Sequence, residues 1–205
     1  MKKVSLILLT LLTSDVLLAD NWQVGAGIYY ADVSGINVYK ASNNINTQDT
    51  KNLNVPYLFV SKDINDKFSI NYRYSYYNSL KGTGTANSSS IFGGGGISLQ
   101  VITDYSIDEK IHENSLGLDY TLLADETWKL IAGPVVSFSS SSAKFTLIDN
   151  PSLISKLTET EVSIGAEILA TLKVSEKAFL NLNYRYSSMG DKNINLIGLG
   201  FTINL

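Results

Sequence analysis

Five charged residues lie among small polar residues in segments that are otherwise rich in apolar side chains. They are Arg73, Asp119, Lys129, Glu167 and Arg185. Each falls on the polar phase of an alternating segment, so all five would point to one side of a β-sheet. A buried charge is costly unless an opposite charge pairs with it. We therefore expect a network in which Glu167 neighbours Arg185, Asp119 neighbours Lys129, and Arg73 completes the set.

Such a network has two possible roles. It could fill and close a narrow enclosed space, or it could line a polar passage for small solutes. The first role is structural, and the second would make the protein a channel.

The only histidine, His112, is the only candidate base for covalent catalysis. A nucleophilic site needs a base within hydrogen-bond reach of a hydroxyl, and Ser115 is the nearest hydroxyl residue along the chain. In a strand these two residues point to opposite faces, so we expect a solvated histidine and no catalytic residue. Since the chain has no cysteine and no second histidine, we also expect no metal site and no cofactor.

The segments that carry these residues alternate apolar and polar positions, which is the signature of β-strands. Eight such segments follow one another, over residues 22–30, 55–59, 68–76, 115–122, 128–138, 162–172, 180–187 and 197–205. One face of each is aliphatic or aromatic, and in the second segment this face is Val55, Tyr57 and Phe59. The other face is mostly Gly, Ser, Asn and Thr.

Short and long connections alternate between these segments. The tight ones lie near 63–67, 124–127 and 173–177, and the connections between them lie near 32–52, 78–112, 139–160 and 188–193, of which only 188–193 is short. This alternation is typical of transmembrane barrels with short periplasmic turns and long extracellular loops. The predicted fold is therefore all-β, a closed antiparallel transmembrane β-barrel of eight strands.

Residues 97–107 also alternate but do not fit the eight-strand scheme. We interpret them as a strand extension or a hairpin above the membrane, because a ninth membrane strand would leave the C-terminus on the wrong side. A ten-stranded barrel is the structural alternative.

The composition of the two faces predicts their orientation. Small polar residues suit the interior of a narrow barrel, and the apolar row would face lipid. Two aromatic girdles are expected at the membrane interfaces. They are Trp22 and Trp128 on the periplasmic side, and Tyr30, Tyr76, Phe138 and Tyr186 on the outer side.

Residues 1–19 have the pattern of a secretory signal peptide, and residues 20–205 would form the barrel domain. Lys2 and Lys3 precede an apolar run over 4–12, and Ala19 offers a cleavage point. Without residues 1–19 the chain keeps 14 of its 16 basic and 18 of its 19 acidic residues, a net charge of −4. Nucleic acid is therefore not an expected partner.

Three stretches resemble a known family: Asn71–Ser75 and Asn183–Ser187, both Asn-Tyr-Arg-Tyr-Ser, and the closing Gly198–Leu205. They are similar to the small eight-stranded outer-membrane barrels, the opacity-protein and OmpA/OmpX-like group. The resemblance implies a monomer in the lipid of a bacterial outer membrane. It also implies that the insertion machinery reads the alternating C-terminal residues Leu199, Phe201, Ile203 and Leu205. The family usually ends in Phe or Trp, whereas this chain ends in Leu205.

The same resemblance implies a structural or surface-interaction role. An extracellular ligand would bind through the segments 32–52, 78–112 and 139–160, of which 82–96 is rich in glycine and serine. The alternative is a narrow channel for small solutes, and a lipid-modifying enzyme using His112 is a weaker one.

Overall fold

The computed structural model of the chain describes residues 22–32, 47–48, 52–92, 97–149, 154–189 and 192–205. The predicted signal peptide over 1–19 lies outside these residues. No helix in the described part of the chain is long and apolar enough to cross a bilayer.

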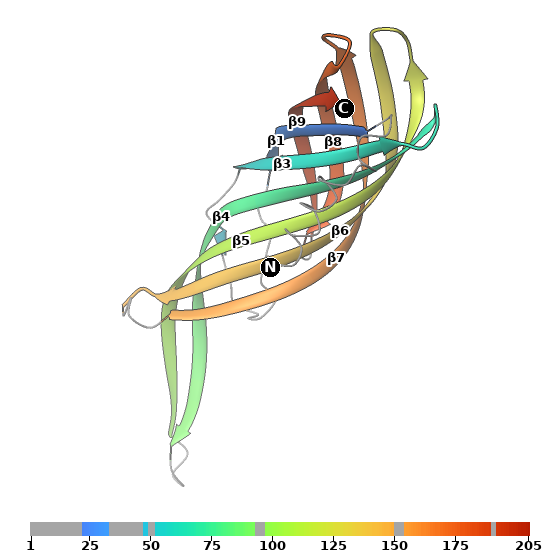
Figure 1. The fold of residues 1–205 in the computed structure, drawn as a ribbon. Helices are drawn as coiled ribbons and strands as arrows, with labels where there is room; N and C mark the ends of the chain where they lie inside the picture. Colours follow the sequence, from blue (N-terminus) through green and yellow to red (C-terminus); the bar gives the residue numbers. More distant parts are fainter. Residues whose placement is uncertain (1–21, 33–46, 49–51, 93–96, 150–153, 190–191) are drawn as a thin grey trace.

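The described residues form eight long strands and one very short strand (Figure 1). In chain order these are β1 (Trp22–Asp32), β2 (Thr47–Gln48), β3 (Asn52–Asp63), β4 (Phe68–Phe92), β5 (Ile97–Ala124), β6 (Trp128–Leu147), β7 (Ile154–Lys173), β8 (Ala178–Met189) and β9 (Lys192–Asn204). The long strands pair antiparallel in sequence order, and β9 also pairs with β1. The pairing therefore closes a barrel of eight strands, as predicted, and the ten-stranded alternative is wrong.

Three tight turns join β3 to β4, β5 to β6 and β7 to β8 at one end of the barrel, which we name the turn end. In the first, the Asn65 side chain accepts hydrogen bonds from the backbone N–H of Lys67 and Phe68 at 2.9 and 3.0 Å. In the second, Asp125 accepts them from Thr127 and Trp128 at 2.6 and 3.3 Å. Such local bonds are why Asn and Asp favour turns.

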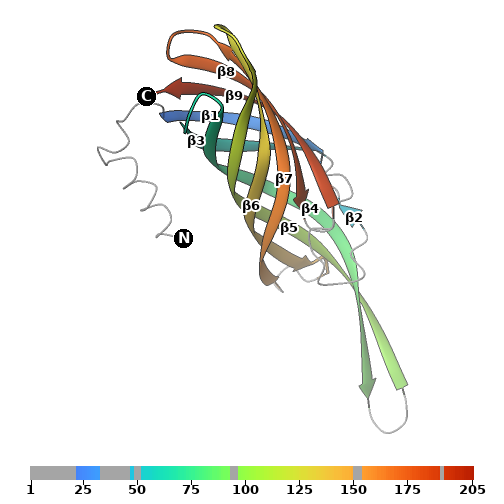
Figure 2. The same ribbon diagram turned by 90° about the vertical axis from the view of Figure 1, so that its right-hand side faces the viewer.

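Strands on the two sides of the barrel differ in length. Strands β4 to β7 have 20 to 28 residues, whereas β1, β3, β8 and β9 have 11 to 13. The β4–β5 hairpin extends farthest and projects well beyond the other strands (Figures 1 and 2). We name this side, opposite the turns, the hairpin end.

The long strands correct part of the predicted loop pattern. The segments 78–112 and 139–160, expected to be loops, are mostly continuations of β4 to β7, and residues 97–107 lie within β5. Residues 97–107 do alternate and, as interpreted, extend a strand, whereas the polar residues 82–90 and 139–142 show no apolar alternation that would mark them as strand. Of the segment 32–52, the described residues Thr47 and Gln48 pair with β4.

A band of exposed apolar side chains surrounds the barrel between the two ends. It runs from Trp128 to Phe138 on β6 and from Val162 to Leu172 on β7. Strands of this length, tilted as in known barrels, cover about 25 Å along the membrane normal. The outer surface therefore matches the hydrocarbon layer of a membrane.

Strand β3 faces opposite to the prediction. Val55, Tyr57 and Phe59, expected to face lipid, are buried inside the barrel, and Leu58 on the other phase is 61% exposed. Both phases of this strand are apolar, so the alternation alone did not identify the lipid-facing side.

Glycines on the neighbouring strands make room for these inward rings. A Cβ atom placed on Gly27 of β1 or Gly200 of β9 would overlap the Tyr57 side chain, and one on Gly25 would overlap Phe59. The small inward residues of β1 and β9 are thus complementary in shape to the aromatic side chains of β3.

Candidate functional site in the barrel lumen

A buried ion pair lies at the centre of the lumen. The Arg73 guanidinium contacts the Glu167 carboxylate at 2.5 Å, and a second nitrogen donates to the same carboxylate at 3.3 Å. Its central carbon also lies 5.2 to 5.8 Å from the ring centroids of Tyr29, Tyr57 and Phe59. The carboxylate and the ring faces together compensate the guanidinium charge where it is removed from water.

A second ion pair crosses the lumen nearer the hairpin end. Arg185 of β8 contacts Glu113 of β5 at 2.6 Å. The same guanidinium donates to the hydroxyls of Ser115 and Ser137 at 3.2 and 2.5 Å. Glu113 also accepts a hydrogen bond of 3.0 Å from the Tyr77 hydroxyl.

Asparagine side chains connect this network to its surroundings. The Asn71 amide donates to Asp119 at 2.6 Å and to Glu167 at 3.1 Å. The Asn183 amide donates to the Tyr29 hydroxyl at 2.9 Å and to Glu167 at 3.3 Å. Glu167 therefore joins side chains from β4 and β8 to its own strand, β7.

Three of the five predicted inward charges form ion pairs in the lumen, and their partners differ from the predicted ones. Glu167 and Arg185 lie opposite each other in the β7–β8 register, as expected, yet each forms its ion pair with a residue across the lumen. In the β5–β6 register Gly117 lies opposite Val135, which places Asp119 four positions away from Lys129. The two ion pairs in the lumen include neither Asp119 nor Lys129.

Glu113 is a member of the network that was not predicted. It is on the same phase of β5 as Ser115, Gly117 and Asp119. Extending that alternation by one more step toward the N-terminus would have placed its side chain in the lumen.

An apolar layer packs against the ion pairs and extends from them toward the hairpin end. Its buried members are Tyr29, Ala31, Val55, Tyr57, Phe59, Tyr77, Leu80, Ile111, Ile194 and Leu196. Apart from the hydroxyls of its three tyrosines, this layer has no side-chain polar groups to replace the water of an ion, and such constrictions resist conduction. The ion pairs and the apolar layer therefore fill the lumen together.

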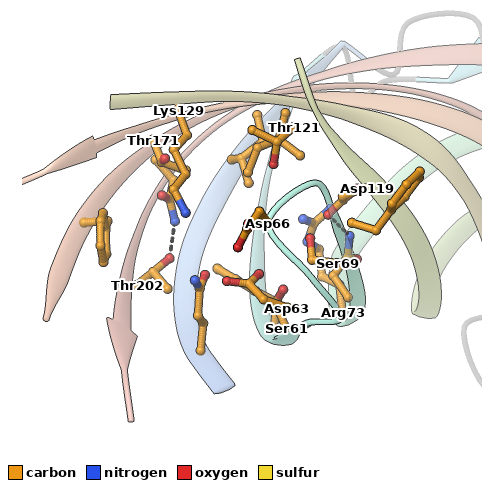
Figure 3. Close-up of a pocket in the computed structure, with 18 of the residues that line it drawn as sticks. Ser61, Asp63, Asp66, Ser69, Arg73, Asp119, Thr121, Lys129, Thr171 and Thr202 are labelled. Atoms are coloured by element: carbon orange, nitrogen blue, oxygen red, sulfur yellow. Dashed lines mark hydrogen bonds between the residues drawn. The ribbon is translucent and has the colours of Figure 1, made fainter. Parts of the chain in front are cut away.

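A polar cavity of about 260 Å³ occupies the turn end of the lumen (Figure 3). Asp63, Asp66 and Lys129 line it together with hydroxyl side chains, and Arg73 and Asp119 lie on the side toward the ion pairs. Asn181 donates to Thr202 in its wall. No group of three or more potential metal ligands occurs among the described residues.

His112 lies on the outside of the barrel. Its Nδ1 atom is 2.6 Å from the Tyr74 hydroxyl, and its ring stacks on Tyr76 at 4.9 Å. Ser115 lies on the opposite face of β5, buried in the lumen and bonded to Arg185. The geometry does not bring His112 and Ser115 together for catalysis.

The predicted girdle residues lie near the two edges of the apolar band. Trp22 and Trp128 begin β1 and β6 at the turn end, and Trp128 faces outward. On the hairpin side, Tyr30, Tyr76, Phe138 and Tyr186 occupy outward positions. Tyr72 and Tyr74 add to this side, and a Phe68–Tyr120 ring pair adds to the turn end.

The C-terminal strand β9 closes the barrel. Leu199, Phe201, Ile203 and Leu205 are all exposed on its outer face. The strand pairs with β8 on one side and β1 on the other, and the Leu205 N–H donates to the Trp22 carbonyl at 3.0 Å.

Comparisons with known proteins give matches among solved structures. No protein-family model matches the chain, and no curated protein matches it by sequence. Ail, the attachment invasion locus protein of Yersinia pestis, is 11% identical with a TM-score of 0.53, over 91% of this chain and 100% of Ail. Neisserial surface protein A is 14% identical with a TM-score of 0.56, over 90% of this chain and 97% of that one.

The outer membrane protein OprG from Pseudomonas aeruginosa is also similar, with 11% identity and a TM-score of 0.51, over 91% of this chain and 97% of that one. Identities this low establish a common fold and carry no further information about activity. The chain therefore has the fold of the small outer-membrane β-barrels.

Proposed function

We propose that this protein is a closed barrel of the bacterial outer membrane that presents an extended sheet to partners outside the cell. Short turns face the periplasm in this architecture, so the turn end is periplasmic and the hairpin end is extracellular. The role is one of surface interaction, and the barrel serves as its membrane anchor.

The length of β4 to β7 is the observation that carries this proposal. These strands continue well past the apolar band, whereas the strands of the other side end close to its edge. A barrel needs strands of only about 9 to 11 residues to span the membrane. The additional sheet therefore has no role in spanning and is available for contact with other molecules.

The filled lumen supports a non-conducting barrel. Arg73, Glu167 and Arg185 are nearly inaccessible to solvent, and the apolar layer packs against them. Eight strands enclose little more than the side chains that fill them.

One of the similar structures is consistent with a surface role. Ail is named as an attachment and invasion protein, and it has also been solved in complex with the heparin analogue sucrose octasulfate. A barrel of this fold can thus bind a partner in addition to lipid.

The outward row of β9 has a separate proposed role. Leu199, Phe201, Ile203 and Leu205 would be read by the barrel-insertion machinery, in the way that the C-terminal pattern of similar barrels is read. The folded product is proposed to be a monomer, since the pairing of β9 with β1 leaves no open strand edge within the membrane band.

Two measurements on the wild-type protein test the surface role. Purified protein in planar lipid bilayers should give no discrete conductance steps. Bacterial cells that express it should adhere to epithelial monolayers more strongly than cells that carry the empty vector. Regular conductance steps together with unchanged adherence would refute the proposal.

A narrow channel is the second candidate, favoured by the polar cavity at the turn end. This cavity would be the periplasmic entrance of a path that the ion pairs and the apolar layer close. If so, wild-type protein would conduct, and removing the charge of Glu167 would change its ion selectivity. A non-conducting wild type would remove this candidate.

A further inference from the structure

Lysines gather on the outer face of the extended sheet, beyond the apolar band. Lys110 of β5, Lys144 of β6 and Lys156 of β7 are all exposed, and we name these three residues the lysine patch. Lys144 lies directly opposite Lys156 in the β6–β7 register. The strands that carry the patch are adjacent in the sheet (Figure 2).

The direct opposition of Lys144 and Lys156 is unfavourable without an anion nearby. Directly opposite side chains have Cβ atoms about 5 Å apart, and like charges at this distance destabilise a sheet. The two ion pairs in the lumen include neither of these lysines. Asp108 lies between Lys81 and Lys144 in the register. Within the two cross-strand rows that contain the patch, the outer face therefore carries four lysines, which are Lys81 and the three patch residues, and one aspartate.

Hydroxyl groups adjoin the patch on the same face. Ser142 lies opposite Lys110 on one side and Thr158 on the other. Ser140 and Thr160 form the next opposed pair toward the membrane, and all four hydroxyl residues are exposed. The face therefore offers both cationic groups and neutral hydrogen-bond donors.

The height of the patch separates it from the lipid. Lys144 is six residues beyond Phe138, and Lys156 is six residues beyond Val162, the last apolar residues of the band on these strands. Six residues correspond to about 20 Å along a strand and, with the usual tilt, to about 15 Å along the membrane normal. The headgroup layer extends only about 5 to 8 Å beyond the hydrocarbon.

We propose that the outer face of β5, β6 and β7 binds a polyanionic polysaccharide that bears sulfate or carboxylate groups. The lysine patch contacts the acidic groups, and Ser142 and Thr158 contact the oxygens of the sugar rings. This inference rests on the proposed surface role and names the chemical class of the partner.

The test measures the binding of fluorescently labelled heparin to the purified full-length protein in a neutral detergent. The Lys144→Gln, Lys156→Gln double variant should bind about tenfold more weakly than the wild type and with a weaker dependence on salt. The Lys67→Gln, Lys177→Gln double variant makes the same change in net charge at the turn end and should bind like the wild type. Heat-dependent migration on gels verifies that both variants are folded.

Two outcomes would overturn this inference. An equal loss of heparin binding in both double variants would mean that net charge, and not the patch, is responsible. Binding to phosphatidylcholine–phosphatidylglycerol vesicles without binding to heparin would identify lipid phosphate as the partner. In either case, adherence of cells expressing the wild-type protein would leave the surface role intact, so the two failures are distinguishable.

Discussion

The side of the barrel wall with short strands and the side with long strands have different roles. Strands β8, β9, β1 and β3 are about as long as the membrane band requires and end near its edge. Strands β4 to β7 provide the same membrane-spanning wall and then continue into the extended sheet. Among the described residues, those that lie beyond the membrane band belong mainly to the second side.

The two sides also fill the lumen differently. The short strands contribute most of its bulk, with the rings of Tyr29, Tyr57 and Phe59 packed against inward glycines. Of the buried charged residues described, Arg73, Glu109, Glu113, Asp119 and Glu167 belong to the long strands, and Arg185 belongs to a short strand. The comparison indicates that packing of rings against glycines stabilises the side of the short strands, and that ion pairing stabilises the side of the long strands.

The largest expected effect comes from the charges of the long side. Glu167→Gln leaves the Arg73 guanidinium buried without an anion, which should cost about 3 to 5 kcal/mol of unfolding free energy. Urea-induced unfolding in lipid vesicles, followed by tryptophan fluorescence, measures the loss. Glu126→Gln, in an exposed turn, should change stability by less than about 0.5 kcal/mol. Equal effects of the two changes would contradict a stabilising role for the lumen pair.

A smaller effect is expected from the packing of the short side. Gly27→Ala introduces a methyl group where the Tyr57 side chain lies, at a cost of about 1 to 3 kcal/mol. Tyr57→Leu in the same chain should recover part of this loss, since it removes the overlapping ring atoms, while the overlap with the Leu199 carbonyl oxygen remains. Ala26→Val, one residue away and facing lipid, provides the control and should be nearly neutral. Additive effects of Gly27→Ala and Tyr57→Leu would argue against the predicted contact.

The extended sheet should respond to pH through Glu109, which lies beyond the membrane band. Burial raises the pKa of Glu109 to about 7, a hydrogen bond from Ser141 lowers it, and the charge of Glu159 raises it. Because the pKa is raised in the folded state, the sheet is most stable below pH of about 4.5 and loses stability as the pH rises through about 7.

Hydrogen exchange of the β5 and β6 amides near Glu109, corrected for intrinsic rates, measures this dependence. Protection should fall by about tenfold between pH 5 and pH 8 in the wild type, and Glu109→Gln should remove most of the change. Identical profiles for the wild type and the variant would exclude Glu109 as the responsible group.

The smallest effect on barrel stability is expected from shortening the hairpin. Thr83 and Ser106 lie opposite each other, so replacing residues 84–105 by Asn-Gly keeps the register and closes the hairpin with a tight turn. The unfolding free energy should change by less than about 1 kcal/mol, because a two-stranded ribbon adds little stability. A large loss in the same urea assay would mean that the hairpin supports the barrel.

The parts of the fold within the membrane band could be predicted from the sequence. In strands such as 68–76 and 180–187, one face meets lipid and the other meets the lumen, so the alternation of side chains reports the structure directly. The eight-strand closure and the outward girdle positions follow from this rule. Strand β3 is the exception, because apolar residues fill its lumen phase as well.

The partners of the inward charges could not be predicted from the sequence in the same way. Counting along strands identifies neighbours within the wall, such as Glu167 and Arg185, but it does not show which side chains meet across the lumen. The Arg73–Glu167 and Arg185–Glu113 pairs depend on the curvature of the closed barrel. The extensions of β4 and β6 were missed because polar runs such as 82–90 and 139–142 show no apolar alternation, whereas residues 97–107 of β5 alternate and were interpreted as a strand extension or hairpin.

The β4–β5 hairpin has a consequence for how deeply the barrel can sit in a bilayer. Among the described residues, 86–92 and 97–103 pair only with each other, so both edges of this part of the ribbon carry backbone groups without a sheet partner. Each such group would cost several kcal/mol in hydrocarbon. The ribbon therefore limits the depth of the barrel in the bilayer from the outer side. The tight turns limit this depth from the periplasmic side.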